Sequence, residues 1–288
     1  PARLDSAPPG GPPLDPPALD RGAMGRVFGA SLTFMVSFGC LIPIFPRWAE
    51  ARGGSLTAVG LATTFAAGVG LVAARPIAAR FMEGRDRRPM MVLGALLAAI
   101  ASESFPWAPG YGALIALRVL QGFGFGLLTT ASVSLVTDLA PAERRGQALG
   151  YFGAINALAL VGGPASGELV ASLFGDGAVF HLSAALCLGV FAFLPGLRES
   201  TKPPVVGRIR LRDAFVGPLR LIALAHFTAL LLHGVILAFL PLRMQGNVDW
   251  MSVGGFFAFD AVMLIVLRVA LGRRRAALED GFEQILTA

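Results

Sequence analysis

The chain has 288 residues, of which 55% are hydrophobic and 15% charged, and its mean hydropathy is +0.68. Soluble domains carry about 25% charged residues, so this chain has too few polar side chains to cover a water-soluble globule of its size. The net charge of +6 does not indicate nucleic-acid binding, because the basic residues lie in short clusters between apolar runs and not on one face. The composition therefore favours a membrane protein, whose apolar surface contacts lipid.

The first segment of the chain, residues 1–26, is rich in proline and poor in residues that a core could bury. Seven of its first seventeen residues are prolines. Such a segment is predicted to be a disordered tail. We expect no cleavable signal peptide, because the apolar run that follows is long enough to be a membrane span itself.

Eight apolar stretches follow the tail, and each is long enough to cross a bilayer as an α-helix. The predicted spans are 27–46, 56–79, 89–107, 111–137, 147–173, 178–197, 216–241 and 251–272. We therefore predict an all-α, polytopic transmembrane helical bundle. Its expected parts are an N-terminal six-helix half (27–197), a cytoplasmic linker (198–215), the first two helices of a second half (216–272) and a cytoplasmic tail (273–288).

The basic residues predict the orientation of these spans. With the N-terminus in the cytoplasm, most of the 24 lysines and arginines lie on the cytoplasmic side. Only Arg47, Arg52 and Arg243 then lie outside, and Arg118 lies within a span. This asymmetry follows the positive-inside rule and predicts a multi-pass protein of a bacterial-type inner membrane with a cytoplasmic N-terminus.

A short internal repeat supports two related halves. The segment 37–46 (SFGCLIPIFP) has a counterpart in 232–241 (LHGVILAFLP), one in each expected half. Parallel repeats of this kind are typical of secondary transporters.

Four short motifs stand in order on the predicted spans and loops: RPIAARFMEGRDRRP (75–89), RVLQGFG (118–124), DLAPAERRG (138–146) and GGPASG (162–167). Together they resemble the major facilitator superfamily, with motif A in the second loop, motif B in the fourth span and motif C of the antiporter branch in the fifth. Glu83 stands where motif A usually has aspartate, and Gly84 and Asp86 depart from its pattern. The resemblance covers about residues 27–272. It implies two six-helix halves around a central cavity, with alternating access by rocking of the halves.

Charged residues beside the second and fourth loops are candidates for a cytoplasmic gate. Arginines and acids at helix ends can form ion pairs that hold the cytoplasmic side shut, whereas anchoring in the membrane surface explains the arginines alone. The predicted gate residues are Arg75, Glu83, Arg87, Arg88, Asp138, Glu143, Arg144 and Arg145.

Polar residues inside the spans are candidates for a proton and substrate cavity. Arg118 lies about 11 Å along its span, and Gln121 shares its helix face. Asp260 lies about 15 Å deep, where the surroundings favour a neutral carboxyl that can take up and release a proton. Asn156 and His233 complete the predicted set. The alternatives are a buried structural ion pair for Arg118, a permanently protonated packing residue for Asp260 and a hydrogen-bonded core histidine for His233.

Gly163 and Gly167 form a small-xxx-small pair beside Pro164, which predicts close helix packing. Resemblance to motif C implies that these three residues also act as an antiporter hinge. Cys40 and Cys187 lie within apolar runs and are expected to be small packing residues. The sequence shows no catalytic, metal-binding or cofactor-binding motif, so we expect no enzyme, no cofactor and no metal site.

The predicted function is proton-coupled export of small organic molecules by alternating access. The expected partners are a small-molecule substrate, protons and the lipid bilayer, and the protein is expected to be a monomer that binds no nucleic acid. A proton- or sodium-driven importer and a non-transporting membrane protein remain alternatives. Because members of the family typically have twelve spans, an eight-span chain is expected to be truncated and not to transport on its own.

Overall fold

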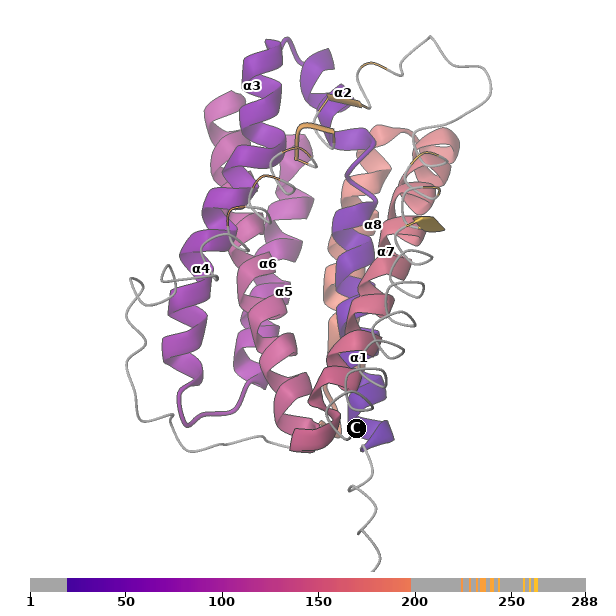
Figure 1. Ribbon diagram of the computed structural model, residues 1–288. Coiled ribbons are helices and arrows are strands. Elements are labelled where there is room, and N and C mark those ends of the chain that lie inside the picture. The colour runs from indigo at the N-terminus through magenta and orange to yellow at the C-terminus, as the bar shows by residue number, and fades with distance from the viewer. Residues whose placement is uncertain are drawn as a thin grey trace, which may run out of the picture.

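The computed structural model describes residues 20–197 and isolated positions between 224 and 263. This part of the chain contains six helical segments that are long and apolar enough to cross a membrane. They stand side by side as a bundle (Figure 1). The predicted all-α, polytopic architecture is therefore confirmed.

The six crossings use regular α-helix with short irregular turns. They consist of α1 (Arg21–Gly39) with α2 (Ile44–Ala51); α3 (Leu56–Gly60), the π-helical turn η1 (Leu61–Phe65) and α4 (Ala66–Met82); α5 (Arg88–Ser104) with η2 (Phe105–Trp107); α6 (Tyr111–Leu139); α7 (Arg145–Phe174), preceded by η3 (Ala142–Arg144); and α8 (Asp176–Gly189) with η4 (Val190–Phe193).

Helix α1 begins six residues before the predicted span. The carboxylate of Asp20 accepts hydrogen bonds of 3.1 Å from the backbone N–H groups of Gly22 and Ala23. An aspartate in this N-cap position satisfies donors that the first helical turn leaves unpaired. Residues 21–26 of the predicted tail are consequently helical.

Glycines allow the helices to approach until their backbones touch. A Cβ atom added at Gly122 of α6 would lie 2.0 Å from the carbonyl oxygen of Ala67 in α4. A Cβ atom at Gly124, on another face of α6, would lie 2.5 Å from the carbonyl oxygen of Gly94 in α5. Lipid supplies little hydrophobic driving force for helix association. Membrane helices therefore associate through close packing contacts of this kind.

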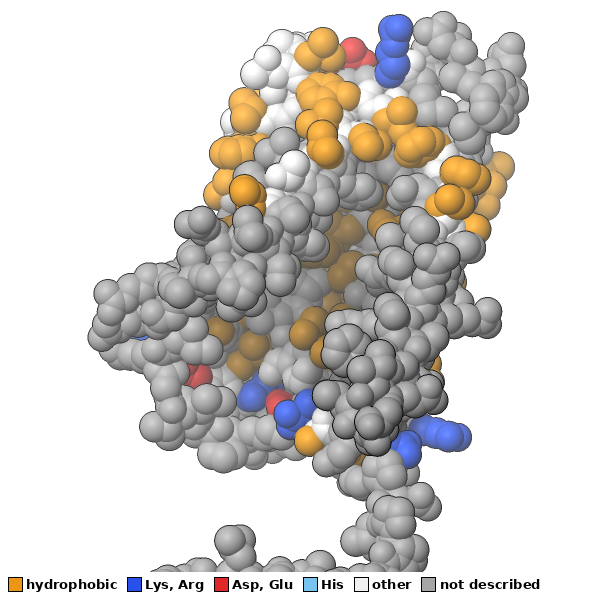
Figure 2. Space-filling view, in the orientation of Figure 1, with side chains coloured by type: hydrophobic (Ala, Val, Ile, Leu, Met, Phe, Trp, Pro, Cys, Tyr) orange, Lys and Arg blue, Asp and Glu red, His pale blue; other side chains and the backbone are white. Residues whose placement is uncertain are grey.

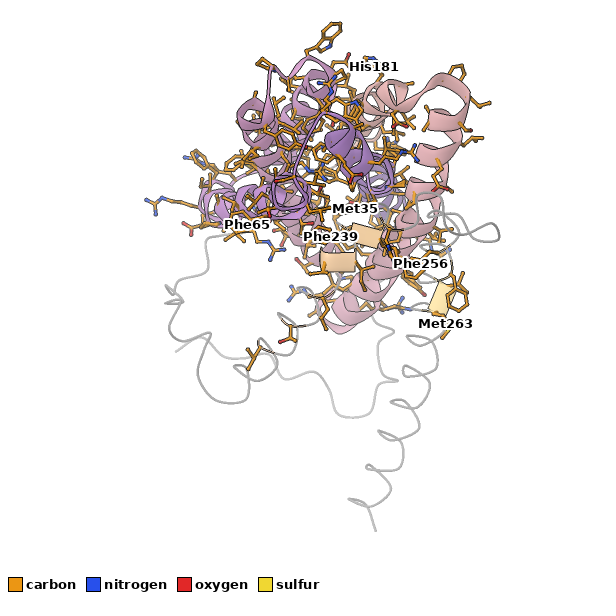
Figure 3. All side chains as sticks on the ribbon, turned by 90° about the horizontal axis from the view of Figure 1, so that it is seen from above. Met35, Phe65, His181, Phe239, Phe256 and Met263 are labelled. Carbon is orange, nitrogen blue, oxygen red and sulfur yellow. The ribbon has the colours of Figure 1, made fainter. Side chains whose placement is uncertain are left out.

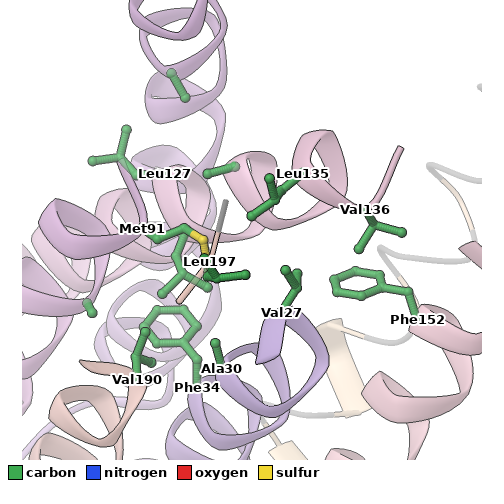
Figure 4. Close-up of a cluster of buried hydrophobic side chains, with 14 of the residues drawn as sticks. Val27, Ala30, Phe34, Met91, Leu127, Leu135, Val136, Phe152, Val190 and Leu197 are labelled. Carbon is green, nitrogen blue, oxygen red and sulfur yellow. The ribbon is translucent and has the colours of Figure 1, made fainter. Parts of the chain in front are cut away.

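Two clusters of apolar side chains fill the space between the helices. One lies in the half of the bundle that contains the start of α1 and includes Val27, Phe34 and Met91; Figure 4 shows these side chains pointing toward one another. The other lies near α2 and includes Phe45 and Phe180. The bundle is thus packed along its length.

The outer surface of the bundle is apolar along the helices. Large hydrophobic side chains such as Val72, Phe81 and Leu158 are more than half exposed. Figure 2 shows the charged side chains of the described residues mainly at the lower end, with apolar side chains above them. This distribution suits a protein whose middle contacts hydrocarbon and whose ends contact water.

The two remaining predicted spans, 216–241 and 251–272, lie outside the described residues apart from isolated positions, as do the predicted linker and C-terminal tail. One of these positions touches the bundle: the hydroxyl of Thr64 in η1 donates to the carbonyl oxygen of Gly234 at 3.3 Å. A Cβ atom added at Gly60 of α3 would lie 3.1 Å from Phe239 Cζ. Viewed from above, His181 lies at the edge of the bundle, away from Phe239 (Figure 3).

Candidate functional site

Arg118 is a buried cation in the middle of the described bundle. Its residue is 7% exposed, and its Nε and Nη2 atoms each donate to the carbonyl oxygen of Thr63 at 3.2 Å. Its Nη1 atom donates to the side-chain oxygen of Gln121, and its guanidinium carbon lies 4.3 Å from the centre of the Phe45 ring. The guanidinium therefore joins the first, second and fourth crossings.

The carbonyl that holds Arg118 belongs to the π-helical turn η1. In this turn the N–H group of Ala66 bonds to the carbonyl oxygen of Leu61, five residues earlier. Such turns interrupt the regular α-helical pattern and are frequent at functional sites. Thr63 lies within η1 and directs its carbonyl oxygen toward α6.

The guanidinium of Arg118 retains hydrogen-bonding capacity. A guanidinium has five N–H donors, and the contacts to Thr63 and Gln121 use three of them. Among the described residues, no carboxylate forms an ion pair with Arg118. The remaining N–H groups can donate to a further acceptor, and a guanidinium binds carboxylates by charge-assisted hydrogen bonds.

Behind Gln121, three serines continue the polar contacts through the bundle. The amide nitrogen of Gln121 donates to Ser102 Oγ at 2.8 Å, Ser102 Oγ lies 3.0 Å from Ser183 Oγ, and Ser183 Oγ donates to the carbonyl oxygen of Ser37 at 2.9 Å. The hydroxyl of Ser37 lies 3.2 Å from Cys187 Sγ. Sequence reasoning missed these serines, because isolated serines in apolar helices carry no distinctive signal.

The structure brings together two of the five predicted cavity residues, Arg118 and Gln121. Asn156 lies on α7, and within the described residues its side-chain oxygen is buried without a hydrogen-bond partner. His233 and Asp260 lie outside the described residues. The predicted roles of these five residues stay predictions.

Among the predicted gate residues, Arg87 contacts four partners in the described part of the chain. Its Nη2 atom lies 3.2 Å from a carboxylate oxygen of Asp138, and the two side chains are 9% and 10% exposed. Its Nε atom donates to Ser134 Oγ at 3.2 Å, and its Nη1 atom donates to the carbonyl oxygens of Met82 and Arg85. Arg87 thus fastens the loop between α4 and α5 to the end of α6.

Other arginines bind the end of the sixth crossing. Arg88 pairs with the carboxylate of Asp86 and donates from Nη1 to the carbonyl oxygen of Leu197 at 3.1 Å. Arg26, at the start of α1, donates to the carbonyl oxygen of Pro195. Asp86, which departs from the motif A pattern, is therefore an ion-pair partner of the nearby Arg88.

The rest of the predicted gate forms no ion pairs within the described part of the chain. Arg75, Glu83 and Arg145 are exposed, and Arg144 is half-buried. The side chain of Glu143 is outside the described set. The observed pairs all lie within the first six crossings, so a gate between two halves stays a prediction.

The GGPASG segment packs α7 against α1. A Cβ atom at Gly163 would lie 2.5 Å from the Cα atom of Gly39, and one at Gly167 would lie 2.1 Å from the carbonyl oxygen of Cys40. Both glycines and Pro164 are buried. These contacts account for close packing, whereas the hinge role implied by motif C stays a prediction.

Comparison with known proteins identifies relatives over most of the chain. The family model described as Major Facilitator Superfamily matches residues 27–277. An uncharacterized MFS-type transporter of Mycobacterium tuberculosis is 39% identical over 98 residues, or 34% of this chain and 17% of the relative. A multi-drug resistance efflux pump PmrA homolog of Lactococcus lactis is 32% identical over 179 residues, or 60% of this chain and 44% of the relative. The chain thus spans less than half the length of these relatives.

Solved structures share the fold at lower identity. The human organic anion transporter MFSD10 (TETRAN) has a TM-score of 0.53 and 22% identity, with 68% of this chain and 52% of that chain covered. A POT family transporter in complex with a thioalcohol-conjugated peptide has a TM-score of 0.54 and 15% identity, with 86% and 50% covered. The helical arrangement of this chain is therefore that of these transporters.

Proposed function

Because the chain belongs to the Major Facilitator Superfamily, we propose that it exports small organic molecules across a membrane in exchange for protons. The direction and the substrate class are supported by relatives that are named as multidrug efflux pumps. The chain covers 44% and 42% of those relatives, so the activity is proposed for the gene product that contains residues 1–288. Substrate passes by alternating access, as in other transporters built from repeated helical halves.

The observation that supports this proposal most directly is the buried cation of Arg118. A charged side chain inside a membrane bundle is costly and is usually retained for function. Arg118 is oriented by a backbone carbonyl and an amide oxygen, and neither of these neutralises its charge. Either a deprotonated carboxyl or a substrate anion can bind beside it. Binding or release of this anion changes the net charge of the site, and this change can couple proton movement to substrate movement.

In the proposed cycle, a carboxyl near Arg118 releases its proton when the cavity opens to one side and takes up a proton when it opens to the other. The guanidinium stabilises the carboxylate form by charge-assisted hydrogen bonds. Asp260 is the predicted carboxyl. Uptake of a proton removes the ion pair, so proton binding and the opening of the cavity are linked.

The proposed orientation places the arginine-rich ends of the helices in the cytoplasm. Arg26, Arg87 and Arg88 lie at one end of the bundle and bind helix-end carbonyls or acids there. Arginines near the ends of membrane spans are more frequent on the cytoplasmic side. In the proposed cycle these contacts hold the first six crossings together while the halves move.

The test is transport by the complete gene product in proteoliposomes with an imposed pH gradient, with ethidium as the fluorescent substrate. We expect movement of ethidium against the direction of proton flow. Arg118→Gln should lower the rate about tenfold or more, because a hydrogen bond to a charged group contributes about 1.5–3 kcal/mol. Arg80→Ala, at an exposed site of α4, serves as the matched control and should transport normally.

Three results would contradict the proposal. Movement of substrate in the same direction as protons would indicate an importer. Dependence on a sodium gradient alone would exclude proton coupling. Normal, pH-driven transport by Arg118→Gln would show that the buried cation has only a structural role.

A further inference from the structure

A continuous chain of hydrogen bonds links Arg118 to the first crossing through four helices. It passes from Gln121 on α6 to Ser102 on α5, then to Ser183 on α8, and ends at the backbone carbonyl of Ser37 on α1. The three heavy-atom distances beyond Gln121 are 2.8, 3.0 and 2.9 Å. Gln121 and the three serines are completely buried, so each group depends on its protein neighbours for hydrogen bonds.

The chain of hydrogen bonds has only one consistent direction. A serine hydroxyl has one proton to donate, and Ser183 gives its proton to the carbonyl oxygen of Ser37, which can only accept. Ser183 must therefore accept from Ser102, whose own proton is then used. Ser102 in turn must accept from Gln121, and only the amide nitrogen of Gln121 can donate.

This direction determines how the Gln121 amide is turned. Because its nitrogen faces Ser102, its oxygen faces Arg118, which can only donate. If the amide turned over, two donors would face each other at Arg118, and a buried donor would lose its partner. The Ser37 carbonyl, three hydrogen bonds beyond Gln121, and the guanidinium of Arg118 thus require the same orientation of the amide.

We infer that Ser102 and Ser183 are positioning residues for Arg118. They fix the amide of Gln121, and the amide fixes the guanidinium against the Thr63 carbonyl. Any consequence for transport rests on the proposed function, whereas the positioning itself does not. The side chain of Ser37 is not part of the relay, because its contribution comes from the backbone.

The inference is tested by the reactivity of Arg118 toward phenylglyoxal in the purified complete gene product, measured by mass spectrometry of the peptide that contains Arg118. The exposed Arg80 provides the internal reference. Ser102→Ala and Ser183→Ala should each raise the relative rate of modification about fivefold, as expected for loss of one buried hydrogen bond. Gln121→Ala should raise it at least as much.

Two serines provide matched controls within the same bundle. Ser37→Ala removes a buried hydroxyl but keeps the carbonyl that ends the relay, so the reactivity of Arg118 should stay within twofold of wild type. Ser132→Ala, on the same helix as Arg118, removes a buried hydroxyl that has no hydrogen-bond partner among the described residues. It should also leave the rate unchanged.

A double substitution separates a relay from a general loss of packing. Ser183→Ala added to Gln121→Ala should have no further effect on Arg118, because the influence of Ser183 passes through Gln121. Additive effects, an unchanged rate in Ser183→Ala, or an equal rise in Ser37→Ala would each overturn the inference.

Folding and transport are measured beside the reactivity. If Ser183→Ala does not yield a folded protein, Ser183→Thr and Ser183→Val replace it, since they have similar shapes and only threonine keeps the hydroxyl. Threonine should preserve the wild-type reactivity and valine should raise it; the same reactivity in both would overturn the inference. If the unmutated protein shows no transport but the serine variants still change the reactivity of Arg118, the relay is supported and the proposed function is refuted.

Discussion

The ion pair between Arg87 and Asp138 allows a prediction about how the cytoplasmic end of the bundle is held together. Both side chains are about nine-tenths buried. Removal of one partner of a buried ion pair costs about 3–5 kcal/mol, because the other charge stays buried. The structure predicts that the two partners are not equivalent, since Arg87 has other acceptors.

Asp138→Ala leaves the guanidinium of Arg87 bonded to Ser134 and to two backbone carbonyls. Its cost should therefore be limited to about 1.5–3 kcal/mol, the range for hydrogen bonds to a charged group. Arg87→Ala removes the ion pair with Asp138 and, with it, the donors to Ser134 and to both carbonyls. It should cost about 3–5 kcal/mol, at the full value for a broken buried pair.

The measurement is the free energy of unfolding of the purified protein in mixed micelles, with denaturant and with a fixed lipid content. Arg80→Ala, at an exposed position of α4, is the control and should change the stability by less than about 0.5 kcal/mol. Equal costs for the two substitutions, or a larger cost for Asp138→Ala, would refute the reasoning. Such a result would mean that the carbonyl contacts of Arg87 contribute little.

Three further substitutions test individual contacts by the same unfolding assay. Gly122→Ala should destabilise by about 1–3 kcal/mol, because its Cβ would overlap the backbone of α4; Gly150→Ala, with no atom near the added carbon, should be neutral or stabilising. Tyr111→Phe should cost about 1 kcal/mol, because it removes a hydrogen bond to the carbonyl oxygen of Ala49 in α2. Asp176→Asn should cost less than about 1 kcal/mol, and less in high salt, because its ion pair with Arg47 is about one-third exposed.

The positions of the crossings could be predicted because hydrocarbon imposes a strict length and composition on each span. The predicted start of the second crossing coincides with Leu56, and that of the fourth with Tyr111. The start of the first crossing was misplaced because hydropathy does not register a capping side chain. Asp20 extends α1 beyond its apolar part, and only local hydrogen bonding reveals this.

Part of the candidate site was also accessible from the sequence. The i to i+3 spacing of Arg118 and Gln121 predicted a shared helix face, and the two side chains are in contact. The contributions of Ser102 and Ser183 could not be predicted. A serine in an apolar helix commonly bonds to a carbonyl of its own helix, and nothing in its sequence neighbourhood shows that it bonds to another helix instead.

The partners of the arginines show why the rest of the site was hidden. Sequence reasoning paired arginines with acids, because charges are visible in a sequence. In the described residues, Arg118 binds a carbonyl in a π-helical turn, and Arg26 and Arg88 bind carbonyls that follow the last helical turn of the sixth crossing. Every residue has a carbonyl, and only an irregular backbone directs one toward a neighbouring helix. The Thr63 carbonyl accepts from two N–H groups of Arg118 without neutralising its charge. In the proposed cycle, the charge that remains attracts an anionic substrate or a titrating acid.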